Sequence, residues 1–360
     1  MPTRDLDRRR FVQGVGLAGL AGLAGCAGGG QGGTETAGSA AAQIGMVYAT
    51  GGLDDGSFND QAQQGLQRAE EELSVASDRT QPSEVSEFAN FQQQFAQSTA
   101  PNYDLVCCIG FLQADALSQT AESHPDQQFT IVDEVVDSDN VASYTFEEQE
   151  GSYLAGMLAG LVSTSDLSAG GGSSGGNGNV GFVGGVESEL IEKFEAGFLA
   201  GVDSLDADVQ TQSTYVGDFS DPQGGREAAL SMYDNDADVV YHAAGNSGEG
   251  VFQAAQEQSK FALGVDRDQS VTAEAYADVI LASMVKRVDT AVYGSIGNVV
   301  DDSFQGGSVT TLGLAEEGVA LVYGQELGEQ VPDDVRSTVS DARQEIVDGD
   351  IDVPETVDGV

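Results

Sequence analysis

Short apolar runs alternate with amphipathic segments along most of the chain. The runs are rich in Val, Ile and Phe and end at polar residues or glycine, which predicts buried strands. Between them, apolar residues recur three or four positions apart, which predicts helices with one buried face. The predicted strands are 44–48, 105–109, 129–132, 141–146, 180–183, 237–243, 261–265 and 319–323. The predicted helices are 61–73, 113–122, 149–162, 190–203, 225–235, 250–258 and 279–293.

This alternation is typical of an α/β protein with parallel sheets and right-handed crossovers. Four predicted strands lead into loops of glycine and small polar residues, which begin at Thr50, Gly110, Gly184 and Ala244. Ligands bind at the carboxyl ends of parallel strands, where glycine lets the backbone approach closely and helix N-termini offer free N–H groups. Because both halves of the chain contain such loops, we expect one binding site shared by two lobes.

The first 26 residues have the pattern of an export signal. Arg8-Arg9-Arg10 precedes a short apolar run, residues 12–24, and small residues then lead to Cys26. Paired arginines indicate the twin-arginine route, and the apolar run is too short to span a bilayer. Leu-Ala-Gly-Cys resembles a lipobox, in which the cysteine becomes N-terminal and carries a lipid. The alternative is an ordinary signal peptide with an incidental cysteine.

Two Gly- and Ser-rich segments interrupt the pattern. Residues 27–43 contain little apolar bulk and are predicted to form a flexible tether after the signal. Residues 168–179 are predicted to form an inserted surface loop within one lobe, because the strand and helix pattern resumes unchanged after them.

The chain is strongly acidic, with 59 Asp and Glu against 14 Lys and Arg and a formal net charge of -45. The lysines are Lys193, Lys260 and Lys286. Self-repulsion of this size is typical of halophilic proteins, in which molar salt screens it. It argues against a nucleic-acid partner, since phosphate binding needs a basic surface.

The sequence offers little for catalysis. Its two histidines, His124 and His242, are too few and too scattered for a zinc motif or a catalytic triad. Asp54-Asp55 is similar to the end of the calcium loop of nucleoside hydrolases, but Tyr48 and Thr50 occupy the first two ligand positions of that loop. We therefore expect no enzyme activity, no metal and no cofactor.

An ordered set of short motifs connects the chain to a known family. The motifs are Gly51–Asn59, Gly110-Phe111, Asn140–Ser143, Glu150–Gly156, Val180–Gly185, Lys193–Phe198, Phe219–Pro222, Ala243–Gly245, Gly264–Gln269 and Ser283–Asp289. Through them the chain resembles the basic membrane protein family of substrate-binding lipoproteins, over about residues 44–325. The best understood members of this family are purine-nucleoside receptors of ABC importers.

The resemblance implies a type I periplasmic-binding fold, in which two Rossmann-like lobes joined by three crossover strands close on a ligand. The first lobe is expected to hold residues 44–145 and 279–303. The second is expected to hold residues 146–278 and 304–360. The signal with its lipobox, 1–26, and the tether, 27–43, precede both lobes.

The resemblance also implies that aromatic side chains from opposite lobes enclose a nucleoside base. Phe58 matches the first of these by its motif, and Tyr241, at the end of its strand, is our choice for the second. Phe111 is a weaker third candidate. The alternative for each is a packing role: Phe58 at a helix entry, and Tyr241 and Phe111 in the core.

Polar ligand contacts are implied in the same way. Asp266 matches the carboxylate that binds ribose, and Lys286 matches a lysine that contacts the sugar from the other lobe. We expect Lys286 on a helix, and a structural salt bridge is the alternative role. Asn59 and Asp115 are further candidates of lower rank, and helix capping is the alternative for Asp115.

One position departs from the family. Nucleoside-binding members usually carry an acidic residue just before the Thr-Gly-Gly run, where it can contact the base edge, whereas this chain has Ala49. Because the loss of a buried acceptor changes which donor groups are recognised, guanosine-like or inosine-like specificity is in doubt.

We expect a monomeric, lipid-anchored receptor on the extracellular face of the plasma membrane, which delivers a nucleoside, in the first place a purine nucleoside, to an ABC permease and its ATPase. The alternatives are a binding protein for a sugar or another small heterocycle and a ligand sensor for a signalling partner. Lobe closure on the ligand is the expected mechanism.

Overall fold

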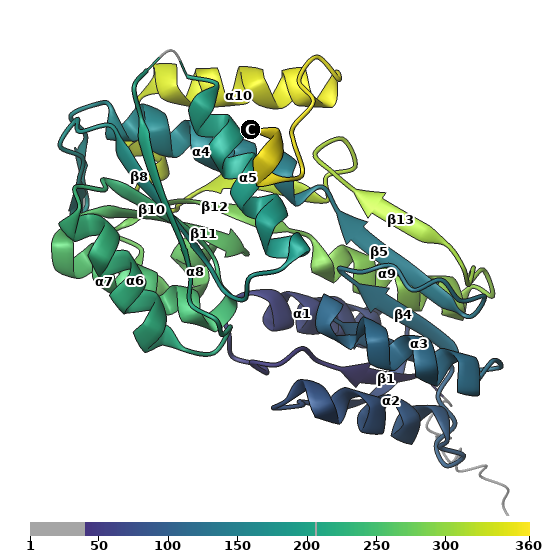
Figure 1. Cartoon of the computed structure of the whole chain (residues 1–360). Helices are drawn as coiled ribbons and strands as arrows, with labels where there is room; N and C mark the ends of the chain where they lie inside the picture. Colours follow the sequence, from purple (N-terminus) through teal and green to yellow (C-terminus); the bar gives the residue numbers. More distant parts are fainter. Residues whose placement is uncertain (1–39, 206) are drawn as a thin grey trace, which may run out of the picture. The chain divides into compact units, whose positions relative to one another are not determined.

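The computed structural model describes residues 40–205 and 207–360, and these contain two six-stranded sheets (Figure 1). The first has the order β13-β5-β4-β3-β1-β2 and the second the order β14-β12-β11-β10-β8-β9. Within both sheets all neighbouring strands are parallel except β12 and β14. We call each sheet with its helices a lobe.

The strands of the first lobe are β1 (Gln43–Val47), β2 (Ala76–Thr80), β3 (Leu105–Ile109), β4 (Gln128–Val132), β5 (Val141–Phe146) and β13 (Val309–Leu312). Those of the second are β8 (Asn179–Gly184), β9 (Gln210–Tyr215), β10 (Val239–Ala243), β11 (Phe261–Asp266), β12 (Ile280–Lys286) and β14 (Val319–Tyr323), with the small hairpin β6 (Ser168–Ala169) and β7 (Gly172–Ser173) beside them.

The helices are α1 (Phe58–Glu72), α2 (Phe88–Ala96), α3 (Ala114–Ser123), α4 (Glu148–Ser163), α5 (Glu189–Asp203), α6 (Pro222–Asp234), α7 (Gly248–Gln258), α8 (Gln269–Thr272), α9 (Val288–Val300) and α10 (Asp333–Val347). Short 3₁₀ turns are η1 (Val85–Glu87), η2 (Phe111–Gln113), η3 (Gly245–Ser247), η4 (Glu274–Tyr276), η5 (Gly328–Gln330) and η6 (Val357–Gly359).

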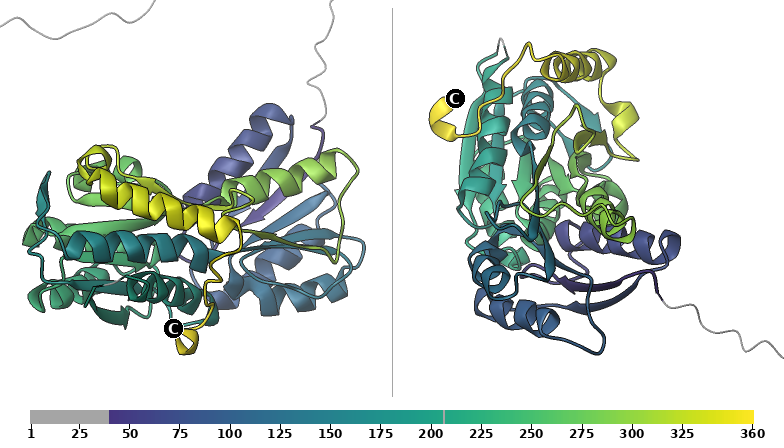
Figure 2. Two further views of the ribbon diagram at one scale, coloured as in Figure 1. Left: turned by 90° about the horizontal axis from the view of Figure 1, so that it is seen from above. Right: turned by 90° about the vertical axis from the view of Figure 1, so that its right-hand side faces the viewer.

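Helices cover both faces of each sheet (Figure 2). In the first lobe α1 packs against α9, and α2 packs against α3. In the second lobe α4 and α5 form one layer, α6 and α7 form the other, and α10 lies on α4. Central strands such as β3 are buried along their whole length, as expected for parallel strands covered on both faces. Residues 40–360 thus form one compact unit.

The chain crosses between the lobes three times: after β5, after β12 and after β13. The lobe boundaries therefore differ from the predicted ones. β12 belongs to the second sheet and β13 to the first, whereas we had placed residues 279–303 in the first lobe and residues 304–360 in the second. The predicted helix 279–293 covers the whole of β12 and the first part of α9, because strand and helix follow each other with only Arg287 between them and both are largely apolar.

Besides β12 and the hairpin β6–β7, three strands were missing from the prediction, and all three are edge strands of their sheets. β2, β9 and β13 are polar and partly exposed, so they carry no apolar run for a pattern to detect. Polar edge strands are common because they prevent pairing with other chains.

The Gly/Ser-rich segment 168–179 is more integrated than the predicted surface loop. It forms the β6–β7 hairpin, and its backbone N–H groups bind Asp278 O at Gly171 (2.8 Å) and Asp238 Oδ1 at Gly175 (2.9 Å). A Cβ atom at Gly172 would lie 2.5 Å from the Phe261 ring, so glycine is needed for this close approach.

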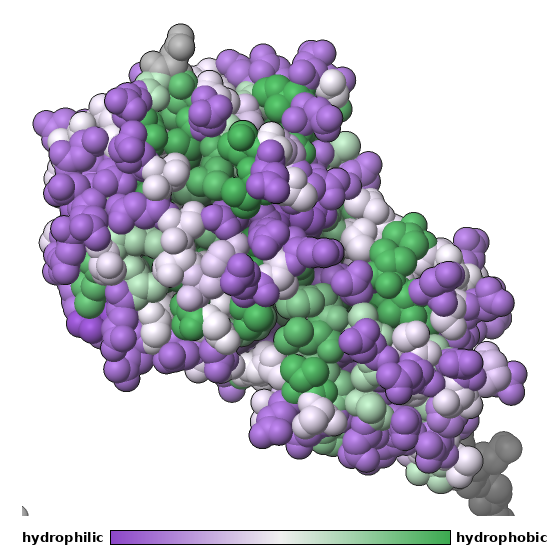
Figure 3. Space-filling view, viewed as in Figure 1, coloured by the Kyte–Doolittle hydropathy of each residue, from purple (hydrophilic) through white to green (hydrophobic). Residues whose placement is uncertain are grey.

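The predicted signal and lipobox, with Cys26, and the tether up to residue 39 lie outside the described residues. In the part of the chain that the structure describes, no helix has the length and apolar character to cross a membrane. The face shown in Figure 3 is mainly hydrophilic, with hydrophobic residues confined to limited patches, consistent with the acidic composition.

Candidate functional site

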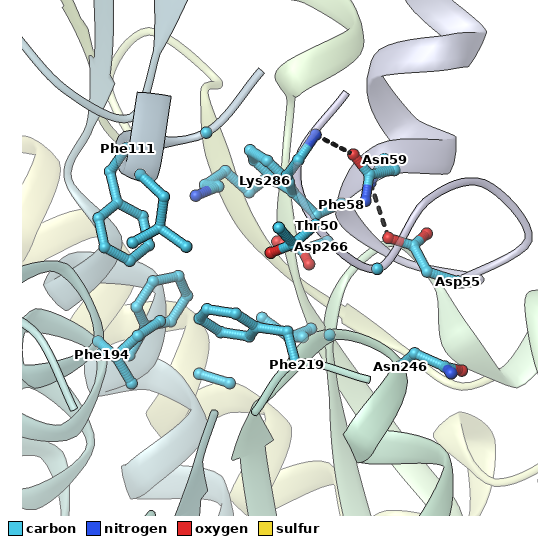
Figure 4. Close-up of a pocket in the computed structure, with 18 residues that line it drawn as sticks. Thr50, Asp55, Phe58, Asn59, Phe111, Phe194, Phe219, Asn246, Asp266 and Lys286 are labelled. Atoms are coloured by element: carbon cyan, nitrogen blue, oxygen red, sulfur yellow. Dashed lines mark hydrogen bonds between the residues drawn. The ribbon is translucent and has the colours of Figure 1, made fainter. Parts of the chain in front are cut away.

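A pocket lies between the two lobes at the carboxyl ends of their strands (Figure 4). The first lobe contributes residues 49–51 after β1, residues of the 55–59 segment, and residues 110–112 after β3. The second contributes side chains of α5, the loop before α6, the ends of β10, β11 and β12, and the turn after β10. The cavity enclosed by these residues has a volume of about 70 Å³ in this structure, so a ligand larger than a few atoms requires the lobes or the lining side chains to move apart.

Aromatic rings from both lobes line this pocket. Phe58 and Phe111 come from the first lobe, and Phe194 and Phe219 from the second. The rings of Phe111 and Phe219 meet edge to face across the cleft with centroids 6.4 Å apart. In Figure 4 the rings of Phe111, Phe194 and Phe219 gather at one end of the pocket, whereas Asp55 and Asn59 lie at the other.

Lys286 brings a buried positive charge to the pocket wall. It is the last residue of β12 rather than part of a helix, and only 2% of it is exposed. Its ammonium lies 2.7 Å from Asp133 Oδ2 and 3.4 Å from Glu148 Oε1. Burial alone lowers the pKa of Lys286, but the surrounding carboxylates outweigh this and hold the pKa above its usual value. The neighbouring carboxylates thus favour the charged form of the side chain.

Asp266 supplies a buried carboxylate at the end of β11. It has a left-handed φ of 63°, which is uncommon for a residue other than glycine and is typical of functional sites. Its Oδ2 accepts a hydrogen bond of 2.5 Å from Ser57 Oγ of the first lobe. Burial raises the pKa of Asp266, while Lys286 and Ser57 oppose this rise.

The 55–59 segment is ordered by its own hydrogen bonds. Asp55 accepts backbone N–H groups of Ser57 (2.9 Å) and Asn59 (2.9 Å), which fixes the start of α1 and presents Phe58 to the pocket. Asn59 Oδ1 accepts the backbone N–H of Ala49 at 2.9 Å, so part of this side chain is used to hold the loop after β1. Burial raises the pKa of Asp55 to about 6, although the backbone N–H groups oppose this rise.

The structure brings five of the seven candidate residues together in one pocket: Phe58, Asn59, Phe111, Asp266 and Lys286. Asp115 does not line it. Asp115 is exposed in the first turn of α3, where its negative charge stabilises the helix by interacting with the positive end of the helix dipole.

Tyr241 is also outside the pocket, so our choice of a second base-stacking residue is corrected. Its side chain is 0% exposed and packs in the core against Phe182 and Phe198, with ring centroids 5.7 and 5.5 Å away. Its hydroxyl lies 3.1 Å from Ser152 Oγ on α4. The residue faces the α4–α5 layer in the middle of β10, whereas the pocket begins at the end of this strand.

Two aromatic residues of the pocket, Phe219 and Phe194, were missing from the prediction. Phe219 lies in the loop before α6, and an aromatic side chain in a loop of an aromatic-poor chain was a usable signal. Phe194 lies on α5 among apolar neighbours, so its sequence context is that of a core residue.

Comparison with known proteins gives a consistent result. Residues 42–357 match the family described as "ABC transporter substrate-binding protein PnrA-like". The "CD4+ T-cell-stimulating antigen" of Listeria monocytogenes is 37% identical over 328 residues, which cover 87% of this chain and 88% of that protein. The "ABC transporter nucleoside-binding protein BmpA" of Lactococcus lactis is 32% identical over 332 residues, 86% of this chain and 88% of that protein.

Among solved structures, a solute-binding protein of an ABC transporter system from Aeropyrum pernix K1 superimposes with a TM-score of 0.76. It is 28% identical, and the match covers 88% of this chain and 95% of that one. The predicted periplasmic-binding fold is thereby confirmed, as is the expectation of a binding protein rather than an enzyme. The chain belongs to the PnrA-like family of ABC transporter substrate-binding proteins.

Proposed function

We propose that this substrate-binding protein binds a nucleoside between its lobes, in the first place a purine nucleoside. The observation that carries the proposal is a single pocket that combines aromatic rings of both lobes with a buried carboxylate and a buried ammonium. The printed name of the Lactococcus lactis relative, a nucleoside-binding protein, supports the same ligand class.

The base is proposed to lie against Phe58 from one lobe and Phe219 from the other. A flat heterocycle between two rings gains dispersion and stacking energy, with little entropy lost because each Phe has only two side-chain torsions. Phe219 replaces Tyr241 in this role, because Tyr241 has no exposed surface to offer.

The sugar is proposed to lie against Asp266 and Lys286. A carboxylate accepts hydrogen bonds from hydroxyl groups and an ammonium donates to them, so together the two charges suit adjacent hydroxyls. Closure on such a ligand follows from its contacts with both lobes, since binding then favours the closed state.

The loop after β1 gives a different prediction for the base edge. Ala49 lines the pocket with a methyl group, and the oxygen of neighbouring Asn59 already accepts the Ala49 N–H. A base whose donor groups need a carboxylate partner finds no such partner at this position. We therefore propose that adenosine binds at least as tightly as inosine and guanosine.

We further propose that Cys26 carries a lipid and holds the domain on the extracellular face of the plasma membrane, beside its permease. The Arg8-Arg9-Arg10 leader and the Leu-Ala-Gly-Cys sequence support this. We also propose that the protein works in concentrated salt, given its net charge of -45, so binding should be measured in molar KCl.

A thermal-shift screen of residues 40–360 with nucleosides, free bases and pentoses tests the ligand class. A ligand at about 100 times its dissociation constant stabilises the fold by about 2.7 kcal/mol, which raises the melting temperature by several degrees. We expect nucleosides to give this shift. Phe58→Ala and Phe219→Ala should each reduce the affinity about 5- to 150-fold, because about 1–3 kcal/mol of stacking is lost.

Tyr241→Phe is the matched control, since it changes an aromatic residue of the core and should leave the affinity unchanged. If only pentoses raise the melting temperature, the proposed sugar contacts are supported and the proposed base contacts are refuted. If no compound in the panel shifts well-folded protein, the nucleoside proposal is wrong and the ligand is another small molecule.

A further inference from the structure

The ammonium of Lys286 lies between two cavities. On one side is the ligand pocket, and on the other is a second cavity at the crossovers, lined by Asp133, Phe146, Glu148 and Lys193 among others. Asp133 lines only this second cavity and has no place in the wall of the ligand pocket. Asp133 contacts the Lys286 ammonium, which does line the ligand pocket, so Lys286 is the direct connection between Asp133 and a ligand.

The partners of Lys286 use up most of its hydrogen-bonding capacity. Its three N–H donors face Asp133 Oδ2 at 2.7 Å and Glu148 Oε1 at 3.4 Å, which leaves one for the pocket. Aromatic rings surround the rest of the ammonium: Phe58, Phe146 and Phe194 have their centroids 5.0, 5.4 and 5.3 Å from Nζ. The direction of the free donor is thus set by the two carboxylates.

The carboxylates come from different parts of the molecule. Asp133 follows β4 in the first lobe, at a left-handed φ of 72°, whereas Glu148 begins α4 at the first crossover. Glu148 is held in turn by Lys193 of α5, at 3.1 Å, and Lys193 also donates to Phe146 O at 2.8 Å. Glu148 is therefore shared between two lysines, while Asp133 has Lys286 as its ion-pair partner among the described residues.

We propose that Asp133 is a positioning residue, which holds the ammonium of Lys286 at the pocket wall so that its remaining donor faces the ligand. Without the Asp133 carboxylate, the long Lys286 side chain would turn toward Glu148, whose attraction is at present the weaker of the two by distance. The other oxygen of Asp133, Oδ1, is buried and has no hydrogen-bond partner among the described residues. The polar contact that this carboxyl group makes there is the one between Oδ2 and Lys286.

The lysine content of the chain allows a direct test without any ligand. Lys193, Lys260 and Lys286 are its lysines, so ¹⁵N-lysine labelling gives three side-chain ammonium signals, and Lys286→Met assigns one of them. Asp133→Asn should move the Lys286 signal and lower the pKa of its ammonium, while the Lys260 signal stays in place. An unchanged Lys286 signal would overturn the proposal.

Asp238→Asn is the matched control, because Asp238 is also fully buried and pairs with Lys260 at 2.5 Å, away from the ligand pocket. This variant should move the Lys260 signal alone. Should Asp133→Asn not fold, Asp133→Ser leaves room for water and makes the same prediction for Lys286.

The effect on the ligand rests on the proposed function and is measured with the nucleoside that gives the largest thermal shift. Asp133→Asn should weaken its binding about tenfold. In the Lys286→Met background the same change should alter affinity less than twofold, because the group through which Asp133 acts is gone. Equal losses in both backgrounds would show a merely structural role and overturn the proposal. If no nucleoside binds, the proposed function fails, while the ammonium signals still decide whether Asp133 positions Lys286.

Discussion

His242 is a buried imidazole away from the ligand pocket, on β10 of the second lobe. Its Nε2–H donates to Gln269 Oε1 at 3.0 Å, and the same oxygen accepts the Val265 N–H at 2.8 Å. Nδ1 is buried and has no hydrogen-bond partner among the described residues. A second proton on the ring would therefore be buried without an acceptor, and burial lowers the pKa of His242 to about 4, although the contact with Gln269 opposes this fall.

The stability of the fold should consequently fall in mild acid. The folded state has the lower pKa, so the neutral ring contributes its full stability above the unfolded-state value of about 6.5, and this contribution is lost as the pH falls toward 4. We expect the wild type to lose about 2 kcal/mol more than His242→Gln between pH 7 and pH 5. Urea unfolding of both proteins in molar KCl measures this difference. His124→Gln, which removes a half-buried histidine, is the control, and equal pH dependence of wild type and His242→Gln would refute the argument.

At the same scale, the site was predictable where a motif fixed the position of a side chain. Phe58, Asn59 and Asp266 belong to ordered motifs at strand ends, and they line the pocket. Tyr241 was chosen as the end of its strand, but β10 continues to Ala243, so the tyrosine lies in mid-strand and packs in the core, whereas Ala243 on the same face lines the pocket. Asp133 lies behind Lys286 rather than in the pocket wall, and only the fold shows that contact.

Helices α4 and α5 of the second lobe approach each other closely because glycines replace larger side chains at the contact. A Cβ atom at Gly156 of α4 would lie 2.0 Å from the carbonyl oxygen of Phe198 on α5. A Cβ atom at Gly201 of α5 would lie 2.0 Å from the carbonyl oxygen of Tyr153 on α4. In both cases the clashing atom belongs to the backbone, which cannot relieve the clash by changing rotamer as a side chain can. The helices must therefore separate if either glycine is enlarged.

The same substitution should accordingly have opposite effects on two helices. Gly156→Ala should destabilise the fold by about 1–3 kcal/mol, because the added methyl group meets the backbone of α5. Gly294→Ala on α9 should stabilise it by about 0.5–1 kcal/mol, since nothing lies within 4 Å of its Cβ position and alanine is the better helix former. Thermal unfolding of the two variants beside the wild type tests the pair. A small effect of Gly156→Ala would mean that the α4–α5 contact is looser than the structure indicates.

The element pattern was predictable where strands are buried and helices amphipathic. β3, β5 and β14 have the predicted bounds, because each is an apolar run with clear ends. At the crossover after β12, a buried strand passes into the largely apolar α9, and neither period dominates the combined stretch. The boundary between the lobes was therefore misplaced at this point, although the α/β class was correct.

The two lobes of residues 40–360 are connected by polar contacts beside the pocket as well as by the three crossovers. Thr272 Oγ1 donates to Gly56 O at 2.8 Å, and Ser57 Oγ donates to Asp266 Oδ2 at 2.5 Å. Arg267 lies 3.8 Å from Asp60. All three contacts join the segment 55–60 of the first lobe to residues 266–272 of the second, so they form only when the lobes are closed. They contribute to closure whether or not a ligand is present.

Removing one of these hydrogen bonds should shift the lobes toward the open state. Thr272→Val keeps the shape of the side chain and removes the donor to Gly56, which costs about 1 kcal/mol, or about fivefold in the equilibrium between closed and open forms. Apparent ligand affinity should fall by up to the same factor, because less of the free protein is ready to bind. Spin labels at Glu122→Cys on α3 and Glu227→Cys on α6 of residues 40–360 measure the distance between the lobes. This part of the chain excludes Cys26, and its native Cys107 and Cys108 are buried. Thr311→Val, which removes a hydrogen bond to Thr145 within the first lobe, should leave this distance unchanged. A distance distribution of Thr272→Val identical to that of the wild type would mean that the crossovers and the ligand alone determine closure.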